Sequence, residues 1–265
     1  MTVPVAVAQF AAGLDKGENL KLVSEAITTA AEAGAQLVVT PEYGMYHDPK
    51  GVGDPGYAEA LDGPFLTGVR ETARAAGVTA VVGMAEAVDG DARAYNTLAT
   101  VGPDGELIGV YRKVHLYDAF GYAESDKVIP AAITEPLTFD LGDLRFGAMT
   151  CYDLRFPETA RTLVDAGATA IVIPAAWAVG PAKEDHWTTL IRARAIENTC
   201  FVLGAGQTGP RCAGQSMIVD PMGTVLASAG EQPGFALATI GVARVNQVRT
   251  VNPALANRRY RVTPA

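Results

Sequence analysis

Two hydrophobic patterns alternate along the chain. Continuous apolar runs rich in valine and isoleucine predict buried strands, and apolar residues spaced three or four positions apart predict amphipathic helices. The predicted strands are 3–10, 36–42, 78–88, 144–151, 168–177, 200–209 and 234–242. The predicted helices are 19–35, 65–77, 157–167 and 183–199. Because strands and helices alternate along most of the sequence, the pattern predicts an α/β fold.

Two further segments, 95–116 and 216–228, predict β-hairpins. In each, a turn sequence (Gly-Pro-Asp-Gly or Asp-Pro-Met-Gly) separates two apolar runs. Hairpins mixed with strand–helix units favour sheets that carry helices on one face and pack against another layer on the other. No linker-like stretch interrupts the sequence, so we expect a single domain over residues 1–265.

The composition narrows the class of protein. The chain has 265 residues, of which 49% are hydrophobic and 19% charged, and its formal net charge is −8. These values favour a folded core and argue against a surface for nucleic acid or an anionic membrane. The N-terminal segment has neither a basic start nor the apolar length of a signal peptide or membrane span. Three cysteines do not form a disulfide framework, which indicates a reducing compartment and hence the cytoplasm.

Three chemically active side chains, Glu42, Lys113 and Cys151, each stand at the end of an apolar strand run. In α/β sheets, ligands bind outside the carboxyl ends of strands, so these side chains would meet if their strands are neighbours. Glu42 can accept the thiol proton, and Lys113 can favour the thiolate and stabilise an oxyanion. The backbone N–H of Tyr152 can point at the same oxyanion. The set is that of acyl transfer: thiolate attack, a thioester, then water.

Each of these residues also has a simpler interpretation. A lone strand cysteine is usually packed in the core, an acid after a proline can lie in a solvated loop, and a lysine can mark a strand end. Cys200 opens a buried strand and is expected in the core, whereas Cys212 lies in a loop and receives no assignment.

Other polar and aromatic residues give weaker signals. His115 can line the pocket or be a hydrogen-bonded structural histidine, and Trp177 ends another strand, where it can form a pocket wall. The three histidines lie at no metal-ligand spacing, so no metal is expected. A G-x-G-x-x-G match at 51–56 follows no predicted strand, and we expect a flexible loop at the mouth of the site.

Longer segments carry a family resemblance. Three stretches resemble the three signatures of the nitrilase superfamily, the carbon–nitrogen hydrolases, and occur in the same order. They are "PEYG" around Glu42, "YRKVHLYD" around Lys113 and "CYDLRFPE" from Cys151. The likeness extends from "VAVAQF" to "NRRYRV". It implies a four-layer αββα sandwich, with Glu42 as general base, Lys113 as oxyanion stabiliser and Cys151 as nucleophile.

The resemblance implies further site residues. "FGYAESD" resembles the family's Gly-Tyr-x-Glu segment, so Glu124 is expected to orient the lysine or assist the water, unless it is a loop acid. "CYDLRFPE" and "HWTTLIRARAIEN" most resemble the Nit-type amidases, which include ω-amidases and deaminated-glutathione amidases. In these enzymes the arginine four residues after the nucleophile can bind the substrate carboxylate. Arg155 has this position, and an ion pair with Asp153 or Glu158 is an equal alternative. Val179 stands where such amidases often carry a threonine, which leaves the exact amide open.

The expected activity is that of a cofactor-free amidase that acts on a small, carboxylate-bearing amide and releases ammonia. An N-carbamoyl hydrolase or an acyl transferase would use the same thioester. A non-enzymatic thiol sensor or partner-binding protein is a third alternative, against which the intact Glu42 and Lys113 argue. Family members commonly dimerise through helices equivalent to 157–167 and 183–199, so a homodimer or higher homo-oligomer is expected.

Overall fold

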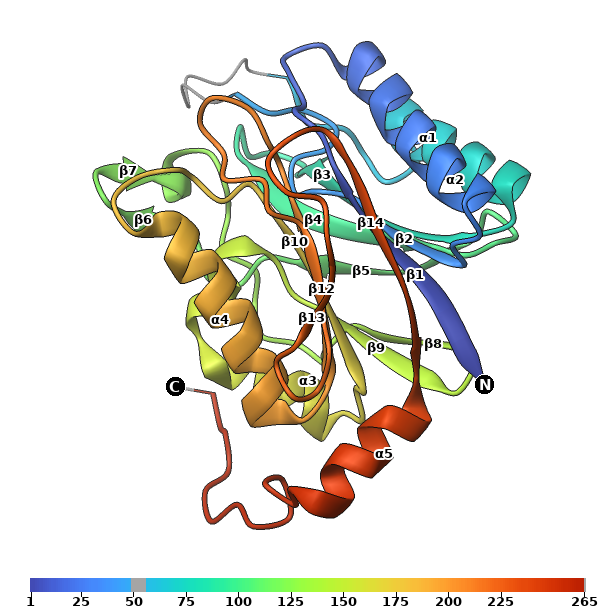
Figure 1. Ribbon diagram of the computed structural model, residues 1–265. Helices are drawn as coiled ribbons and strands as arrows, with labels where there is room; N and C mark the ends of the chain where they lie inside the picture. The colour runs from blue at the N-terminus through green and yellow to red at the C-terminus, as the bar shows by residue number, and fades with distance from the viewer. Residues whose placement is uncertain (49–55, 265) are drawn as a thin grey trace.

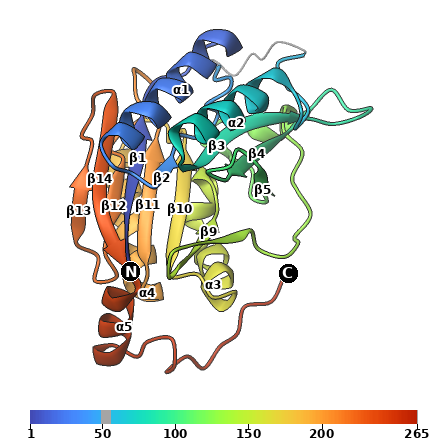
Figure 2. The same ribbon diagram turned by 90° about the vertical axis from the view of Figure 1, so that its right-hand side faces the viewer.

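The computed structural model describes residues 1–48 and 56–264. Figure 1 shows β-sheets stacked between pairs of helices. The first six-stranded sheet has the order β14-β1-β2-β3-β4-β5. Its strands are β1 (Thr2–Gln9), β2 (Leu37–Val39), β3 (Thr79–Ala87), β4 (Ala94–Val101), β5 (Leu107–Arg112) and β14 (Gly234–Gly241). Helices α1 (Lys16–Glu32) and α2 (Pro64–Ala76) cover the outer face of this sheet (Figures 1 and 2).

The second six-stranded sheet has the order β13-β12-β11-β10-β9-β8. Its strands are β8 (Thr138–Leu141), β9 (Leu144–Ala148), β10 (Ala170–Ala175), β11 (Phe201–Gly206), β12 (Met217–Val219) and β13 (Val225–Ser228). Helices α3 (Pro157–Asp165) and α4 (Lys183–Asn198) lie against its outer face (Figure 1). Both predicted hairpins are confirmed, since β4 pairs antiparallel with β5 and β12 with β13.

Hydrophobic clusters fill the spaces between the four layers. One cluster joins α1 and α2 to the first sheet, a second lies between the two sheets, and a third joins the second sheet to α3 and α4. Strand β10 contributes to two of them, because Val172 belongs to the cluster between the sheets and Ile171 and Ile173 belong to the helix side. Burial on both faces explains the nearly continuous apolar runs in the sequence. The α/β prediction and the implied αββα sandwich are confirmed.

Local signals set the helix ends. The Asp15 carboxylate caps α1 by accepting a hydrogen bond from the Glu18 backbone N–H at 3.0 Å. Pro157 is the first residue of α3, as the sequence predicts. Helix α2 is capped at its C-terminus by Gly77, whose φ of 66° is a left-handed conformation that glycine adopts without steric cost.

Some element boundaries differ from the prediction. Strand β2 ends at Val39 and β9 at Ala148, so Glu42 and Cys151 lie in the segments that follow their strands. Pro41 lacks the N–H that a continued ladder would need, and Cys151 begins a short 3₁₀ turn. Helix α5 (Val242–Val251) is absent from the predicted elements, because β14 runs directly into it and its valines resemble a continued strand.

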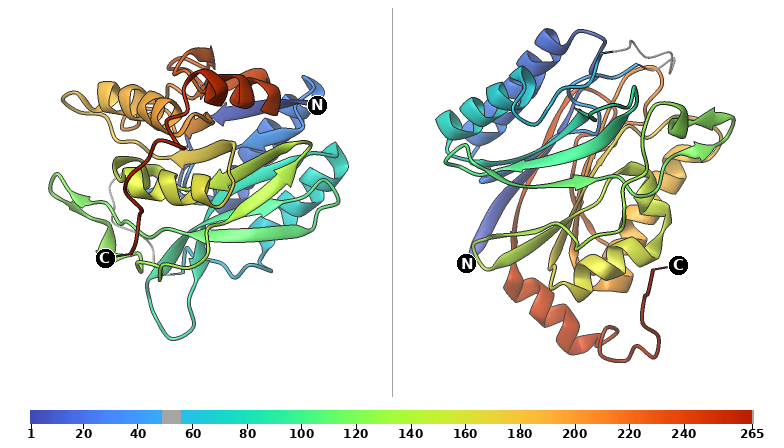
Figure 3. Two further views of the ribbon diagram at one scale, coloured as in Figure 1. Left: turned by 90° about the horizontal axis from the view of Figure 1, so that it is seen from below. Right: turned by 180° about the vertical axis from the view of Figure 1, so that it is seen from behind.

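Two segments lie outside the sheets. Strands β6 (Asp118–Ala119) and β7 (Tyr122–Ala123) form a small hairpin near the start of α4, which Figures 1 and 3 show. The C-terminal residues 252–264 leave α5 and pass beneath α3 (Figure 3), where Arg258 pairs with Asp165. The G-x-G-x-x-G match at 51–56 lies, apart from its last glycine, outside the described residues.

Candidate active site

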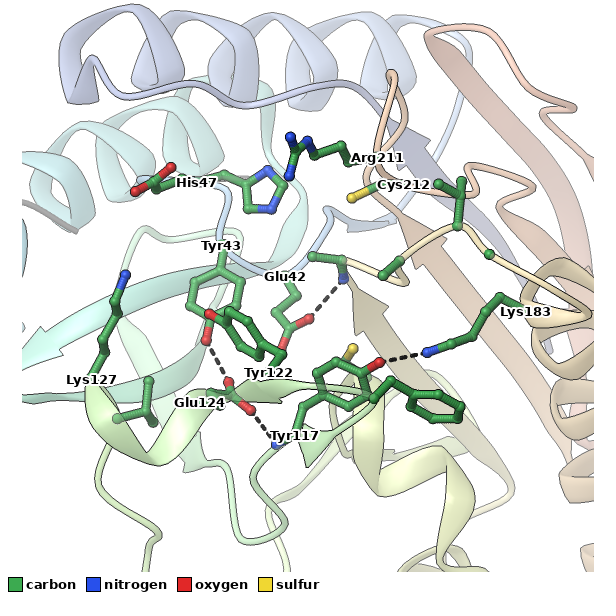
Figure 4. Close-up of a pocket in the computed structure, with 18 of the residues that line it drawn as sticks. Glu42, Tyr43, His47, Tyr117, Tyr122, Glu124, Lys127, Lys183, Arg211 and Cys212 are labelled. Carbon is green, nitrogen blue, oxygen red and sulfur yellow. Dashed lines mark hydrogen bonds between the residues drawn. The ribbon is translucent and has the colours of Figure 1, made fainter. Parts of the chain in front are cut away.

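A cavity of about 540 Å³ opens where strands of both sheets end. Glu42 follows β2, Lys113 follows β5 and Cys151 follows β9. All three line the cavity, together with Glu124 from the turn after β7. Figure 4 shows both glutamates within this cavity. The structure therefore brings together the four residues that the sequence singles out for chemistry.

Glu42 is buried, and several donors hold its carboxylate. Oε1 accepts hydrogen bonds from Lys113 Nζ at 2.9 Å and Asn96 Nδ2 at 2.8 Å. Oε2 accepts the backbone N–H of Ala176 at 2.7 Å. The Cys151 thiol lines the same cavity as this carboxylate. The hydrogen bonds thus fix a carboxylate, which can accept a proton, in the cavity that also contains the thiol.

Glu124 is also buried, and its hydrogen-bonding capacity is more fully used. Oε1 accepts hydrogen bonds from Tyr43 Oη and, at 3.1 Å, Asn96 Nδ2. Oε2 accepts the Tyr117 backbone N–H at 2.6 Å, and Lys113 Nζ lies 3.0 and 2.9 Å from the two oxygens. Burial alone would raise the pKa of Glu124, but the Lys113 charge and these hydrogen bonds outweigh it and lower the pKa.

The Lys113 ammonium lies between the two carboxylates and is almost completely buried. Burial opposes its charge, yet the fields of Glu124 and Glu42 are stronger and raise the pKa of Lys113 well above its ordinary value. The side chain therefore remains a cation over the whole neutral range. A fixed positive charge beside the thiol can stabilise negative charge that develops there.

Cys151 has a strained backbone, with a φ of 47° in the left-handed region. It starts the 3₁₀ turn Cys151–Arg155, which Asp153 ties down by accepting the Thr150 backbone N–H at 3.0 Å. Burial first, and Glu42 second, raise the pKa of the Cys151 thiol well above its ordinary value, although Lys113 opposes the shift. The resting group is a thiol, and any attack by its sulfur would require the proton to leave.

The predicted binding residues Tyr152, Arg155 and Trp177 line a small recess of about 30 Å³. The recess shares Cys151 and Lys183 with the large cavity. Arg155 pairs with neither of its two acidic neighbours in the sequence, so the ion-pair alternative is wrong. Its guanidinium carbon instead lies 4.8 Å from the centroid of a Trp177 ring.

His115 has a different environment from that of the other predicted binding residues. Its Nδ1 lies 2.8 Å from Asp153 Oδ1, and its ring stacks on Phe156 with centroids 3.9 Å apart. Neither the cavity nor the recess has His115 among its described lining residues. The structure thus places the His115 ring against Asp153 and Phe156. This agrees with the alternative prediction of a hydrogen-bonded structural histidine.

Several residues that line the cavity or support its glutamates carry no clear sequence signal. Asn96 lies in β4, where its amide bridges the two glutamates, and only its polarity within an apolar strand marks it. Tyr43, which follows Glu42 directly, has a φ of 57°. Lys183 begins α4, and Figure 4 shows it reaching toward Tyr117 across the cavity.

The other two cysteines differ in position. Cys200 is fully buried in the cluster beneath α4, as predicted. Cys212 lines the cavity, and burial together with Glu42 raises the pKa of its thiol to about 12. Among the residues that the structure describes, no group of three or more His, Cys, Asp or Glu side chains is arranged to hold a metal ion. Within the same ranges, each helix is too short or too polar to traverse a lipid bilayer.

Comparison with known proteins identifies the class. The sequence model of the carbon–nitrogen hydrolase family matches residues 4–250. A Mycobacterium tuberculosis protein named as a hydrolase is 40% identical over 261 residues, which cover 92% of this chain and 91% of that one. The chain therefore belongs to the carbon–nitrogen hydrolase family and is an enzyme of the amidase type.

More specific relatives place it within that family. The deaminated glutathione amidase of Escherichia coli O157:H7 is 37% identical, with 97% of each chain covered. The Caenorhabditis elegans NitFhit protein superposes with a TM-score of 0.89 at 30% identity, over 97% of this chain and 65% of that one. Nit3 of Saccharomyces cerevisiae, a nitrilase-superfamily member, gives 0.86 at 26% identity, over 98% and 97%. The chain is a nitrilase-superfamily protein of the Nit-type amidase branch.

Proposed function

We propose that this protein is a cysteine-dependent amidase that cleaves the C–N bond of a linear carboxamide in a small, carboxylate-bearing substrate. One observation carries the proposal: Glu42, Lys113 and Cys151 line one cavity, where the buried Glu42 carboxylate accepts a hydrogen bond from the Lys113 ammonium. A base on the thiol proton, beside a buried cation for the oxyanion, is what thiol attack on an amide carbonyl requires.

The first half of the reaction forms a thioester. Glu42 takes the proton of the Cys151 thiol while the sulfur attacks the amide carbonyl carbon. The carbonyl oxygen becomes an oxyanion next to Lys113 Nζ and the backbone N–H of Tyr152. Glu42 then returns the proton to the departing nitrogen, the C–N bond breaks, and ammonia leaves the acyl group bound to sulfur.

The second half hydrolyses the thioester. A water molecule enters the position that ammonia has left, and Glu42 removes one of its protons as the oxygen attacks the acyl carbon. The C–S bond then breaks, the sulfur regains a proton, and the product leaves as a carboxylic acid. The same base serves both halves because its carboxylate is fixed by Lys113, Asn96 and the Ala176 N–H.

Glu124 supports Lys113 in this scheme. Both of its oxygens already accept hydrogen bonds, and its lowered pKa makes it a poor proton acceptor. It therefore holds the ammonium in place and balances its charge. This arrangement favours the orienting role over the alternative in which Glu124 activates the water.

The substrate class follows from the recess and from the relatives. Arg155 provides a guanidinium beside Cys151 that suits a carboxylate. The E. coli relative is named a deaminated glutathione amidase. The structure of a mutant amidase of Nesterenkonia was solved in complex with acrylamide. It is 26% identical to this chain, with a TM-score of 0.82 over 97% of this chain and 94% of that one. The cavity of this protein, about 540 Å³, is larger than acrylamide would fill, which favours a larger amide as the substrate.

A substrate panel tests the proposal. We expect ammonia release from a carboxylate-bearing amide, and loss of this activity to background in Cys151→Ala and Cys151→Ser while circular dichroism stays unchanged. Mass spectrometry of the wild-type protein during turnover should show the acyl group on Cys151. Undiminished hydrolysis by Cys151→Ala would eliminate the scheme.

The products separate the alternatives. Carbon dioxide released together with ammonia would identify an N-carbamoyl hydrolase, and a product that depends on an added amine would identify an acyl transferase. Absence of turnover on every amide, nitrile and carbamoyl compound would favour a thiol sensor. Such a protein needs the Cys151 thiol but does not cleave a substrate bond.

A further inference from the structure

Lys183 is a buried cation at the edge of the cavity. It is the first residue of α4, and only 6% of it is exposed. Its Nζ donates a hydrogen bond to Tyr117 Oη at 2.6 Å. Over residues 1–48 and 56–264, no carboxylate forms an ion pair with it. An ammonium has three donors, so this group retains hydrogen bonds to give.

A second cation shares the same recess. Arg155 lies with Lys183 around the small space next to Cys151. Burial of Lys183 first, and the Arg155 charge second, lower the pKa of Lys183. The Nε of Arg155 is buried without a hydrogen-bond partner, and its Nη2 lies 3.4 Å from His186 Nδ1. Two like charges without an acid, one buried and one half-buried, are unfavourable by themselves. An anion in the recess would relieve this cost.

Aromatic rings hold both cations without neutralising them. Lys183 Nζ lies 3.9 Å from the centroid of the Phe120 ring and 4.8 Å from that of Tyr117. The Arg155 guanidinium lies over Trp177. Such contacts stabilise a cation by the ring quadrupole and leave its N–H donors available, in contrast to an ion pair.

The dimensions of the recess suit a small anion. Its volume of about 30 Å³ matches roughly two water molecules at about 10–15 Å³ each, which is close to the size of one carboxylate group. The recess meets the large cavity at Cys151, so a group held there would be only a few bonds from the scissile carbonyl.

We infer that Lys183 is a specificity-determining residue, which binds a carboxylate of the substrate jointly with Arg155 in the recess beside Cys151. This inference rests on the proposed amidase function and adds to it the residue that distinguishes an anionic from a neutral amide. Tyr117 connects the two parts of the site, since its hydroxyl accepts from Lys183 and its backbone N–H donates to Glu124. The position of the bound carboxylate is thereby fixed relative to the catalytic groups.

Calorimetric binding to the inactive Cys151→Ala variant tests the inference without turnover. The probes are succinamate and butyramide, which have the same chain length and differ by a carboxylate in place of a methyl group. We expect succinamate to bind more tightly. Adding Lys183→Met should weaken succinamate about 10- to 100-fold, the range for a hydrogen bond between charged groups, and change butyramide by less than about threefold.

Two further variants make the test specific. Lys183→Arg keeps a cation and should restore part of the preference for succinamate, which a merely structural role would not explain. Lys127→Met removes another lysine that lines the cavity and should affect succinamate less than Lys183→Met does. Equal losses for both probes in Lys183→Met, or an equal loss of succinamate binding in Lys127→Met, would overturn the inference.

The two proposals can fail separately. If Cys151→Ala prefers succinamate in a Lys183-dependent way but the wild-type protein hydrolyses no amide, the carboxylate subsite stands and the amidase scheme falls. If the wild-type protein hydrolyses amides through Cys151 with no Lys183-dependent preference for the anion, the amidase scheme stands and the subsite falls.

Discussion

The cluster of Glu42, Lys113 and Glu124 and the adjoining recess differ in how their charged side chains are paired. In the cluster, one ammonium lies between two carboxylates, and every charged atom has a partner. In the recess, Arg155 and Lys183 face the same space with aromatic rings and a phenol as their neighbours. The cluster is complete without a ligand, whereas the recess lacks a counter-charge. In the proposed function, this difference separates the groups that perform the chemistry from the groups that select the substrate.

The largest effect is expected from removing the cation of the cluster. Lys113→Met would leave Glu42 and Glu124 as buried carboxylates without their shared partner. Breaking a buried pair from one side costs about 3–5 kcal/mol of unfolding free energy, and losing an oxyanion donor costs about 10²–10³-fold in kcat. Urea unfolding and ammonia release measure the two losses. Lys21→Met, on the exposed face of α1, is the matched control and should change neither. A Lys113→Met variant with wild-type stability would contradict the complete pairing of the cluster.

A pH effect of intermediate size is expected from Glu124. Its pKa is lowered in the folded protein, so its ionised form contributes stability above the ordinary value of 4.5, and this contribution is lost as pH falls through the lowered pKa. Unfolding free energy measured between pH 6 and pH 3 should fall less steeply in Glu124→Gln than in the wild-type protein. Glu18→Gln, on the surface of α1, serves as the control. Identical slopes for Glu124→Gln and the wild-type protein would show that the carboxylate is not held by Lys113.

The smallest effect on stability is expected in the recess. Arg155→Met removes one of two like charges that have no acid partner, and it also removes ring contacts worth about 0.5–1 kcal/mol. We therefore expect the unfolding free energy to change by less than about 1 kcal/mol in either direction, while binding of a carboxylate-bearing amide is lost. Urea unfolding beside calorimetry provides the comparison with Lys113→Met. A loss of several kcal/mol would mean that Arg155 is a structural cation after all.

The sequence predicts the framework well because burial on both faces makes the strands nearly continuous apolar runs. The ends of those runs led directly to Glu42, Lys113 and Cys151, which the structure places around one cavity. The helix start at Pro157 was equally predictable, since its ring presets the backbone for a first turn.

Other residues could not be found from local pattern. Lys183 begins a helix as an ordinary charged residue, and its role depends on Tyr117 and Phe120, which lie far from it in the sequence. His115 follows Lys113 at a spacing compatible with a shared face, but its ring contacts Asp153 and Phe156 and is not among the described residues that line the cavity. These side chains are placed by tertiary packing, which periodicity does not encode.

The position of Glu42 between the layers has a wider consequence. Glu42 follows strand β2 of the first sheet, whereas the two groups that bind it follow strands of the second. The Ala176 N–H binds its carboxylate and the Gln207 amide binds its backbone carbonyl. If one layer slipped past the other by about an ångström, every strand ladder would stay intact, but the proposed base would be misplaced. Such a displacement can cost about 10²-fold in rate. The rate of turnover is therefore expected to depend on the relative position of the two sheets. It would fall before spectroscopy detected any loss of structure.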